Sequence, residues 1–200
     1  TNAAPTDDPQ WPVVRPVYRL DLEQQAAFLV QAAALGLAAG AERIAVYKLY
    51  DQALPPGGES FGILSPADQQ PRPAYRAWQT VTRYLGDAVG AQRARTARAD
   101  AVRLTHRDGR QTLLTWARGE AGAVVEIGAT GEKAYLMDQY GNTRLLRPDN
   151  GVYRLRLDGA RCNPVDGCAV GGPAAILIQP EGAAAVRDVS ESAAVTMQFE

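Results

Sequence analysis

The spacing of hydrophobic residues changes halfway along the chain. Between residues 21 and 86, apolar residues recur every three or four positions, which is the period of a helix packed on one side. From residue 101 to about residue 180, apolar and polar residues alternate, which is the period of a β-strand. The pattern therefore predicts an α/β first part, residues 1–86, followed by an all-β part, residues 101–180.

Two helices are predicted in the first part. Asp21 and Gln24 have the spacing of a capping box, and Gly40 suits the position just after the end of the first helix. Pro73 suits the first residue of the second helix, which Gly86 closes. Both helices are thus bounded by residue types that begin or stop a helix.

A short apolar run, residues 44–50, lies between these helices. Its length and its short connection to the first helix are typical of a buried parallel strand. The proline-rich residues 1–18 and residues 51–70 are predicted to be long loops. Helix, strand, long loop and helix in this order indicate part of a (β/α)8 barrel, namely its last helices and its eighth strand.

The second half is predicted to be an antiparallel β-sandwich. Asp108-Gly109 is a strong signal for a tight turn between two strands, and many short strands at this spacing favour a sandwich. Residues 87–100, rich in Ala and Arg, are interpreted as an interdomain linker, and residues 181–200 as a tail or an incomplete further segment. The expected strands span residues 102–107, 112–117, 124–127, 134–137, 143–146, 152–157 and 175–178.

Composition and charge narrow the range of partners. The chain of 200 residues is 46% hydrophobic with a formal net charge of −1, which gives no overall attraction to nucleic acid or to an anionic membrane. Arg93, Arg95 and Arg98 form a basic cluster without the interleaved aromatic residues that stack on bases, so no nucleic-acid partner is expected. Apolar residues 26–41 are too few for a membrane span.

Cys162 and Cys168 are separated by five residues that include Pro and Gly. A turn at this spacing brings two Cβ atoms within bridging distance, which predicts a disulfide and an oxidising, extracellular environment. Two free thiols or half of a metal site are the alternatives. The metal alternative is weaker, because the chain has one histidine and two cysteines, so neither a metal nor a cofactor is expected.

Three other side chains in the predicted strands have structural interpretations. His106, beside a turn, is expected at the surface rather than as a ligand. Trp116 and Tyr153 are expected in the sandwich core, where they need no ligand, with an exposed glycan-binding stripe as the alternative.

The candidate binding site lies in the loops that follow the strands, because a parallel barrel presents its chemistry at the carboxyl ends of its strands. Carboxylates and amides bind the hydroxyl groups of a sugar, and its C–H face stacks on aromatic rings. Lys48 either pairs with Asp51, the favoured interpretation, or binds a carboxylate or hydroxyl group. The candidate sugar-facing residues are Asn2, Tyr47, Lys48, Tyr50 and Asp51.

Several motifs carry a family resemblance. The Phe-Gly-Ile-Leu run at residues 61–64 and Pro-Arg-Pro-Ala-Tyr at residues 71–75 resemble the segment before the eighth helix of clan-A-type glycoside hydrolases. Thr-Asn at residues 1–2 resembles the pair that follows the nucleophilic Glu at the end of the seventh strand in that family. Residues 138–142 and 150–153 are similar to parts of the β-sandwich often attached to such barrels.

The resemblance implies a retaining mechanism, which needs one carboxyl group as acid/base and another as nucleophile. In the family these groups end the fourth and seventh strands, so no catalytic residue is assigned in this chain, and the nucleophile is expected just before Thr1. The family typically places Trp after the eighth strand as the stacking residue. Residues 47–51 contain no Trp, which leaves the stacking residue open between Tyr47 and Tyr50.

The sequence is interpreted as a C-terminal fragment of an extracellular glycoside hydrolase whose partner is a carbohydrate substrate, the fragment itself lacking both catalytic carboxylates. The alternative is a non-catalytic carbohydrate-binding or extracellular interaction protein with a degenerate barrel. A Glu immediately before Thr1 would favour the enzyme, and any other residue there would favour the alternative.

Overall fold

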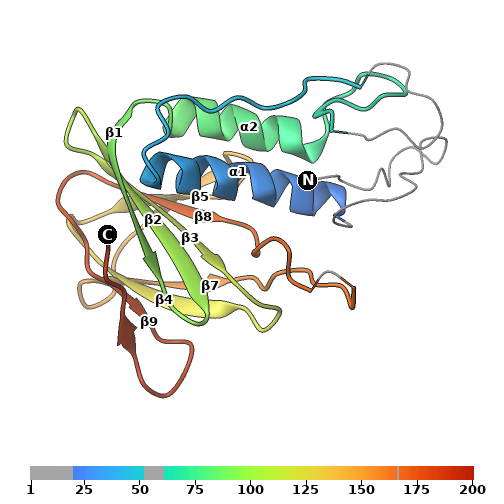
Figure 1. Ribbon diagram of the computed structural model, residues 1–200. Helices are drawn as coiled ribbons and strands as arrows, with labels where there is room; N and C mark the ends of the chain where they lie inside the picture. Colours follow the sequence, from blue (N-terminus) through green and yellow to red (C-terminus); the bar gives the residue numbers. More distant parts are fainter. Residues whose placement is uncertain (1–19, 52–60, 166) are drawn as a thin grey trace.

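The computed structural model describes residues 20–51, 61–165 and 167–200, which stack in three layers (Figure 1). Two helices form the first layer, a six-stranded sheet the second and a four-stranded sheet the third. The helices are α1 (Leu22–Ala38) and α2 (Pro73–Tyr84). The strands are β1 (Ala88–Arg95), β2 (Ala99–His106), β3 (Gln111–Ala117), β4 (Ala123–Gly128), β5 (Ala134–Met137), β6 (Thr143–Leu146), β7 (Val152–Leu157), β8 (Ala175–Gln179), β9 (Val186–Asp188) and β10 (Val195–Thr196).

The strands pair antiparallel in both sheets. The six-stranded sheet has the order β1-β2-β3-β8-β5-β6, and the four-stranded sheet has the order β10-β9-β4-β7. The turn at Asp108-Gly109 closes the β2–β3 hairpin, and Gly109 adopts a φ of 85°, which costs glycine little. The predicted antiparallel sandwich is therefore confirmed.

The two helices begin and end close to the predicted residues. The carboxylate of Asp21 accepts a hydrogen bond from the backbone N–H of Gln24 at 2.7 Å, and the Gln24 side chain accepts one from the backbone N–H of Asp21 at 2.8 Å. Gly40, two residues past the end of α1, has a φ of 85°. Pro73 is the first residue of α2, where its missing N–H costs nothing.

Two apolar clusters hold the layers together. One lies between the two sheets and includes Val125, Tyr153 and Leu177, and the other lies between the helices and the six-stranded sheet and includes Val30 and Trp116. Trp116 and Tyr153 are each 2% exposed, so the prediction that they belong to the core is confirmed. The helices therefore pack directly on the sandwich.

Residues 87–100 differ from the predicted linker. Most of this segment forms β1, the edge strand of the six-stranded sheet, and the start of β2. The sequence signal was weak because β1 consists mainly of Ala, Gly and Arg, with Val89 as its one β-branched residue and no aromatic residue. Much of this edge strand faces solvent, so it needs few large apolar side chains.

Residues 181–200 are part of the sandwich instead of a tail. They contain β9 and β10, and the backbone groups of Glu200 and Arg93 exchange hydrogen bonds at 2.9 and 3.0 Å. The strands here have only three and two residues. An alternation of apolar and polar residues cannot be recognised over so short a run, so the sequence did not predict these two strands.

The strand predicted for residues 44–50 is not formed. Within the described part of the chain, no strand lies alongside this run. Its backbone contact is local, because the N–H groups of Ile63 and Leu64 donate to the Leu49 carbonyl oxygen at 3.0 and 2.9 Å. A parallel strand needs a neighbour to complete its ladder, so an apolar run alone does not determine it.

His106 is buried and does not lie at the surface as predicted. The residue is 2% exposed, with Nδ1 2.7 Å from Asp87 Oδ1 and Nε2 2.8 Å from Thr112 Oγ1. It thereby joins the segment before β1 to the β2–β3 hairpin. The alternation of polar and apolar residues assigned His106 to one face of a strand, but only the tertiary structure shows that this face is covered.

Cys162 and Cys168 form the predicted disulfide, with a Cα–Cα distance of 4.2 Å. The loop that it closes is also held by backbone hydrogen bonds between Asn163 and Gly167, at 3.1 and 2.8 Å. The bond therefore reinforces a turn that already has its own backbone contacts.

Replacing both cysteines, Cys162→Ser with Cys168→Ser, should lower the free energy of unfolding by about 2 kcal/mol, because closing so short a loop removes little chain entropy. Denaturant unfolding of the two proteins measures this difference. Reductant should destabilise the wild type by a similar amount and leave the double variant unchanged. Equal stability of the two oxidised proteins would contradict the prediction.

Candidate functional site

Four of the five predicted sugar-facing residues, Tyr47, Lys48, Tyr50 and Asp51, lie where the segment after α1 meets the segment before α2. The carbonyl oxygen of Leu49 accepts two backbone hydrogen bonds from the second segment, as described above. The backbone N–H of Arg72 donates to the Ile63 carbonyl oxygen at 3.0 Å, one residue before α2 begins. These bonds hold the aromatic and charged side chains of the first segment near the N-terminal end of α2.

Asp51 is the centre of this junction. Its carboxylate accepts hydrogen bonds from the backbone N–H groups of Phe61 at 3.1 Å and Gly62 at 3.0 Å, and its side chain is 1% exposed. A Cβ atom on Gly62 would lie only 2.8 Å from Asp51 Oδ2. Glycine at this position therefore lets the carboxylate approach the backbone.

Two cations compensate the buried carboxylate. Lys48 Nζ lies 3.4 Å from Asp51 Oδ1, and Arg72 Nη1 lies 3.8 Å from Asp51 Oδ2. Arg72, whose side chain is 2% exposed, also donates to the Gly62 carbonyl oxygen at 2.7 Å. The favoured pairing of Lys48 with Asp51 is confirmed. In this arrangement the Asp51 carboxylate faces the protein and holds the two segments together.

Tyr47 and Tyr50 are the solvent-facing aromatic residues of the segment. They are 76% and 46% exposed. The Tyr47 ring centroid lies 6.1 Å from that of Phe61 and 5.8 Å from Lys48 Nζ, and the peptide bond between Tyr47 and Lys48 is cis. The site thus presents an exposed aromatic face beside an ammonium group, which suits stacking on a sugar and hydrogen bonding to a hydroxyl group.

Four of the five predicted residues lie together in one segment: Tyr47, Lys48, Tyr50 and Asp51. Asn2 lies outside the described residues, so its place in the site stays a prediction. Sequence reasoning missed Arg72, which supplies a buried cation to the junction. Arg72 belongs to the Pro-Arg-Pro-Ala-Tyr run at residues 71–75 that carries the family resemblance, but this run did not indicate a buried side chain, because arginine is mostly exposed in folded proteins.

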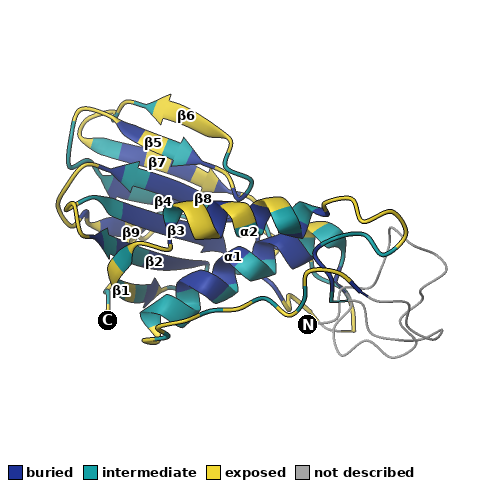
Figure 2. Cartoon of the chain, turned by 90° about the horizontal axis from the view of Figure 1, so that it is seen from above, coloured by how far each residue is buried: buried dark blue, intermediate teal, exposed yellow. Residues whose placement is uncertain are grey.

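An apolar groove of about 290 Å³ runs between α1 and residues 44–47. Phe28 and Leu29 of α1 line it. Glu23 is the one exposed residue of α1, and Figure 2 shows this helix mainly in the colours of buried and intermediate positions, whereas α2 carries several exposed ones. A groove with so few polar groups suits hydrocarbon side chains better than a hydroxylated ligand.

The chemistry of the site is limited to stacking, hydrogen bonding and charge pairing. Asp51 is the single carboxylate among residues 44–51 and 61–64. Among the residues that the structure describes, no three His, Cys, Asp or Glu side chains are grouped so that they would hold a metal ion. No helix in the described ranges is long and apolar enough to span a membrane.

The fold is similar to that of a known protein. A solved structure of a family 39 glycoside hydrolase from the gut symbiont Bacteroides cellulosilyticus WH2 matches with a TM-score of 0.57 and 20% sequence identity, over 77% of this chain and 30% of that chain. This chain therefore spans less than a third of the length of that protein. No family model and no curated protein matches the sequence. The match covers 77% of this chain, whereas the sandwich residues 88–200 are just over half of it. The likeness therefore also includes part of the helical half.

Proposed function

We propose that this chain is the C-terminal part of a retaining glycoside hydrolase that acts on a polysaccharide or another glycoside. In this proposal residues 1–86 complete a (β/α)8 barrel, and the sandwich packs on the outside of its last two helices. The observation that carries the proposal is the structural likeness to a family 39 glycoside hydrolase, which extends beyond the sandwich into the helical half. A shared fold does not identify an activity, so the residues of the site supply the remaining support.

The burial of α1 on two sides supports a barrel. Ala26 and Val30 pack towards α2 and the six-stranded sheet, while Phe28 and Leu29 line the apolar groove on another side. A helix that is apolar all round is normally buried all round, and each helix of a (β/α)8 barrel covers a strand with its inner side. We therefore assign the groove to barrel strands of the parent. Residues 44–50 have no paired neighbour in the described chain, and in this proposal they become the eighth strand when the neighbouring barrel strands are present.

The site residues take separate roles in this barrel. Tyr47 and Tyr50 stack on the sugar, Lys48 donates a hydrogen bond to a hydroxyl group, and Asn2 approaches from the end of the seventh strand. Asp51 positions the segment through its main-chain and cation contacts. Retention needs two carboxyl groups about 5–5.5 Å apart, and we place both on other strands, the nucleophile at the end of the seventh.

The disulfide supports an extracellular location for the parent enzyme. Cys162 and Cys168 are bonded to each other, and such bonds persist mainly in oxidising compartments. A secreted enzyme of this kind meets glycans outside the cell, which agrees with carbohydrate as the proposed partner.

In the full-length parent, Tyr47→Ala and Tyr50→Ala should each reduce kcat/KM for the glycoside by about tenfold or more. The physical reason is that an aromatic ring under a sugar contributes on the order of 1–2 kcal/mol of apolar contact. Tyr135→Ala is the matched control, because Tyr135 is 48% exposed but lies on β5 of the sandwich. Initial rates at limiting and saturating substrate measure the effect.

Full turnover in both tyrosine variants would contradict the assignment of the site. A parent that binds sugar through Tyr47 and Tyr50 without hydrolysing it would support the alternative, a non-catalytic carbohydrate-binding protein with a degenerate barrel. The residue before Thr1 in the parent separates the two cases independently, because the enzyme requires a Glu there.

A further inference from the structure

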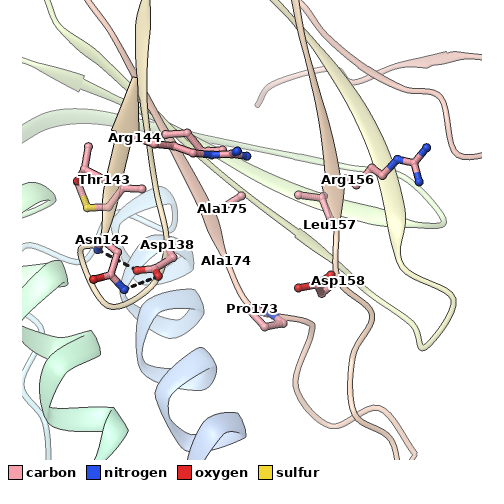
Figure 3. Close-up of a pocket in the computed structure, with 12 residues that line it drawn as sticks. Asp138, Asn142, Thr143, Arg144, Arg156, Leu157, Asp158, Pro173, Ala174 and Ala175 are labelled. Atoms are coloured by element: carbon pink, nitrogen blue, oxygen red, sulfur yellow. Dashed lines mark hydrogen bonds between the residues drawn. The ribbon is translucent and has the colours of Figure 1, made fainter. Parts of the chain in front are cut away.

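A second cavity lies in the sandwich, apart from the tyrosine segment. It has a volume of about 360 Å³ and lies where the two sheets part, between the β5–β6 hairpin and the end of β7 (Figure 3). Small-molecule sites typically begin at about 300 Å³. None of the residues predicted to face a sugar lines this groove, so it is not part of the site described above.

The floor of this groove is apolar. Leu136 comes from β5, Leu157 from the end of β7, and Ala174 immediately precedes β8. Leu157 and Ala174 are 5% and 3% exposed, and Leu136 is half-buried. The floor is therefore the margin of the core between the two sheets, a surface against which C–H groups can pack.

Charged side chains form the walls. Arg144 reaches from β6 across the groove, and Asp158 turns a carboxylate oxygen towards the same space from just beyond β7 (Figure 3). Both residues are exposed, and neither side chain has a hydrogen-bond or ion-pair partner in the described part of the chain. By contrast, the Asn142 amide donates to Asp138 Oδ2 at 2.7 Å, which fixes the β5–β6 turn.

The formal charges around the groove cancel. Arg144 and Arg156 contribute two positive charges, and Asp138 and Asp158 contribute two negative charges. The guanidinium groups would attract a phosphate while the carboxylates repelled it. The carboxylates would attract an ammonium group while the guanidinium groups repelled it. A charged ligand therefore gains little binding energy from the net charge of the groove. A polyhydroxylated ligand matches this set, because a hydroxyl group accepts from a guanidinium and donates to a carboxylate.

We propose that this groove binds a neutral pyranose unit of an oligosaccharide, as a second carbohydrate site. The C–H face of the sugar lies on Leu136 and Leu157, and its hydroxyl groups bridge Arg144 and Asp158. The site needs no catalysis and so goes beyond the proposed function, although the choice of an oligosaccharide as the polyol rests in part on that function.

The first turns of α1 connect the two sites. The Gln25 amide donates to the Gly62 carbonyl oxygen at 3.4 Å, beside the tyrosine segment. The Tyr140 hydroxyl, in the β5–β6 turn beside the groove, donates to the Glu23 carboxylate. Burial and this hydrogen bond raise the pKa of Tyr140, so it remains a donor.

The test is binding of three neutral probes, cellohexaose, xylohexaose and mannohexaose, to the chain by isothermal titration calorimetry. A Tyr47→Ala/Tyr50→Ala background removes the stacking rings of the first site. At least one probe should bind with a Kd in the millimolar range or tighter. Arg144→Ala and Asp158→Ala should each weaken that binding tenfold or more, because each removes a charged hydrogen-bond partner.

Arg147→Ala and Glu132→Ala are the matched controls, since both residues are exposed and lie outside the groove. These two control variants should bind the oligosaccharide probe as tightly as the Tyr47→Ala/Tyr50→Ala background does. Arg144→Lys and Asp158→Asn preserve the side-chain size and so test whether a loss of binding comes from altered folding. Thermal unfolding of every variant should match the wild type.

Absence of binding for all three probes overturns the proposal, as does binding that survives both Arg144→Ala and Asp158→Ala. Either failure leaves the glycosidase proposal standing, because that proposal is tested by turnover in the parent.

Discussion

Replacing Asp51 by alanine should lower the free energy of unfolding by about 3–5 kcal/mol, because it removes a buried carboxylate that pairs with a buried guanidinium and accepts two backbone hydrogen bonds. The Arg72 side chain is 2% exposed and lies 3.8 Å from the Asp51 carboxylate. The backbone N–H groups of Phe61 and Gly62 would lose their acceptor at the same time. Denaturant unfolding followed by circular dichroism measures the loss.

Glu42→Ala provides the matched control for this measurement. Glu42 precedes the same segment but is exposed, so its removal should change the stability by no more than about 0.5 kcal/mol. A loss of stability below about 1 kcal/mol in Asp51→Ala would show that the contact between the segment after α1 and the segment before α2 does not depend on the carboxylate. Other contacts would then have to hold Tyr47 and Tyr50 in place.

Replacing Gly172 by alanine should lower the free energy of unfolding by about 3 kcal/mol or more, because the new methyl group collides with the backbone. A Cβ atom there would lie 2.0 Å from the carbonyl oxygen of Asp158. The same residue binds β3 and α1, since its N–H donates to the Ala117 carbonyl oxygen and its own carbonyl oxygen accepts from Gln31, both at 2.8 Å. A shift of this backbone therefore loosens the contact between the helix and the sandwich.

Gly119→Ala is the control for the effect of an added methyl group. Gly119 lies in the connection between β3 and β4, and, apart from Gly119 and its chain neighbours, no heavy atom of the described residues lies within 4 Å of the position of its Cβ. Its replacement should change the stability by at most about 0.5 kcal/mol. Thermal and denaturant unfolding of both variants gives the comparison, and equal stabilities would contradict the collision argument.

The elements that the sequence predicted correctly are those whose signals lie within a few neighbouring residues. The capping box of α1, Pro73 at the start of α2 and the Asp108-Gly109 turn act through local backbone geometry. The disulfide is local as well, because its cysteines are only six positions apart. Four of the predicted sugar-facing residues also lie together for a local reason, since they form one continuous segment; their binding role stays a prediction.

The elements that the sequence did not predict depend on neighbours from distant parts of the chain. β1 is a strand because β2 and the C-terminal residues pair with it, although its own side chains are poor strand formers. Residues 44–50 have the right composition for a strand but no paired neighbour in the described ranges. Pairing is a property of two segments, so one apolar run does not determine it.

The sequence by itself determined the helix ends, most strands, the tight turn and the cysteine pair, because each is encoded in local spacing and residue type. Only the tertiary structure decided that Asp51 and His106 are buried, that Arg72 completes the junction, and that a groove opens beside Arg144. Burial and cavities depend on which surfaces are brought together from distant positions. Local spacing assigns a residue to a face of an element, but it does not contain the layer that covers that face.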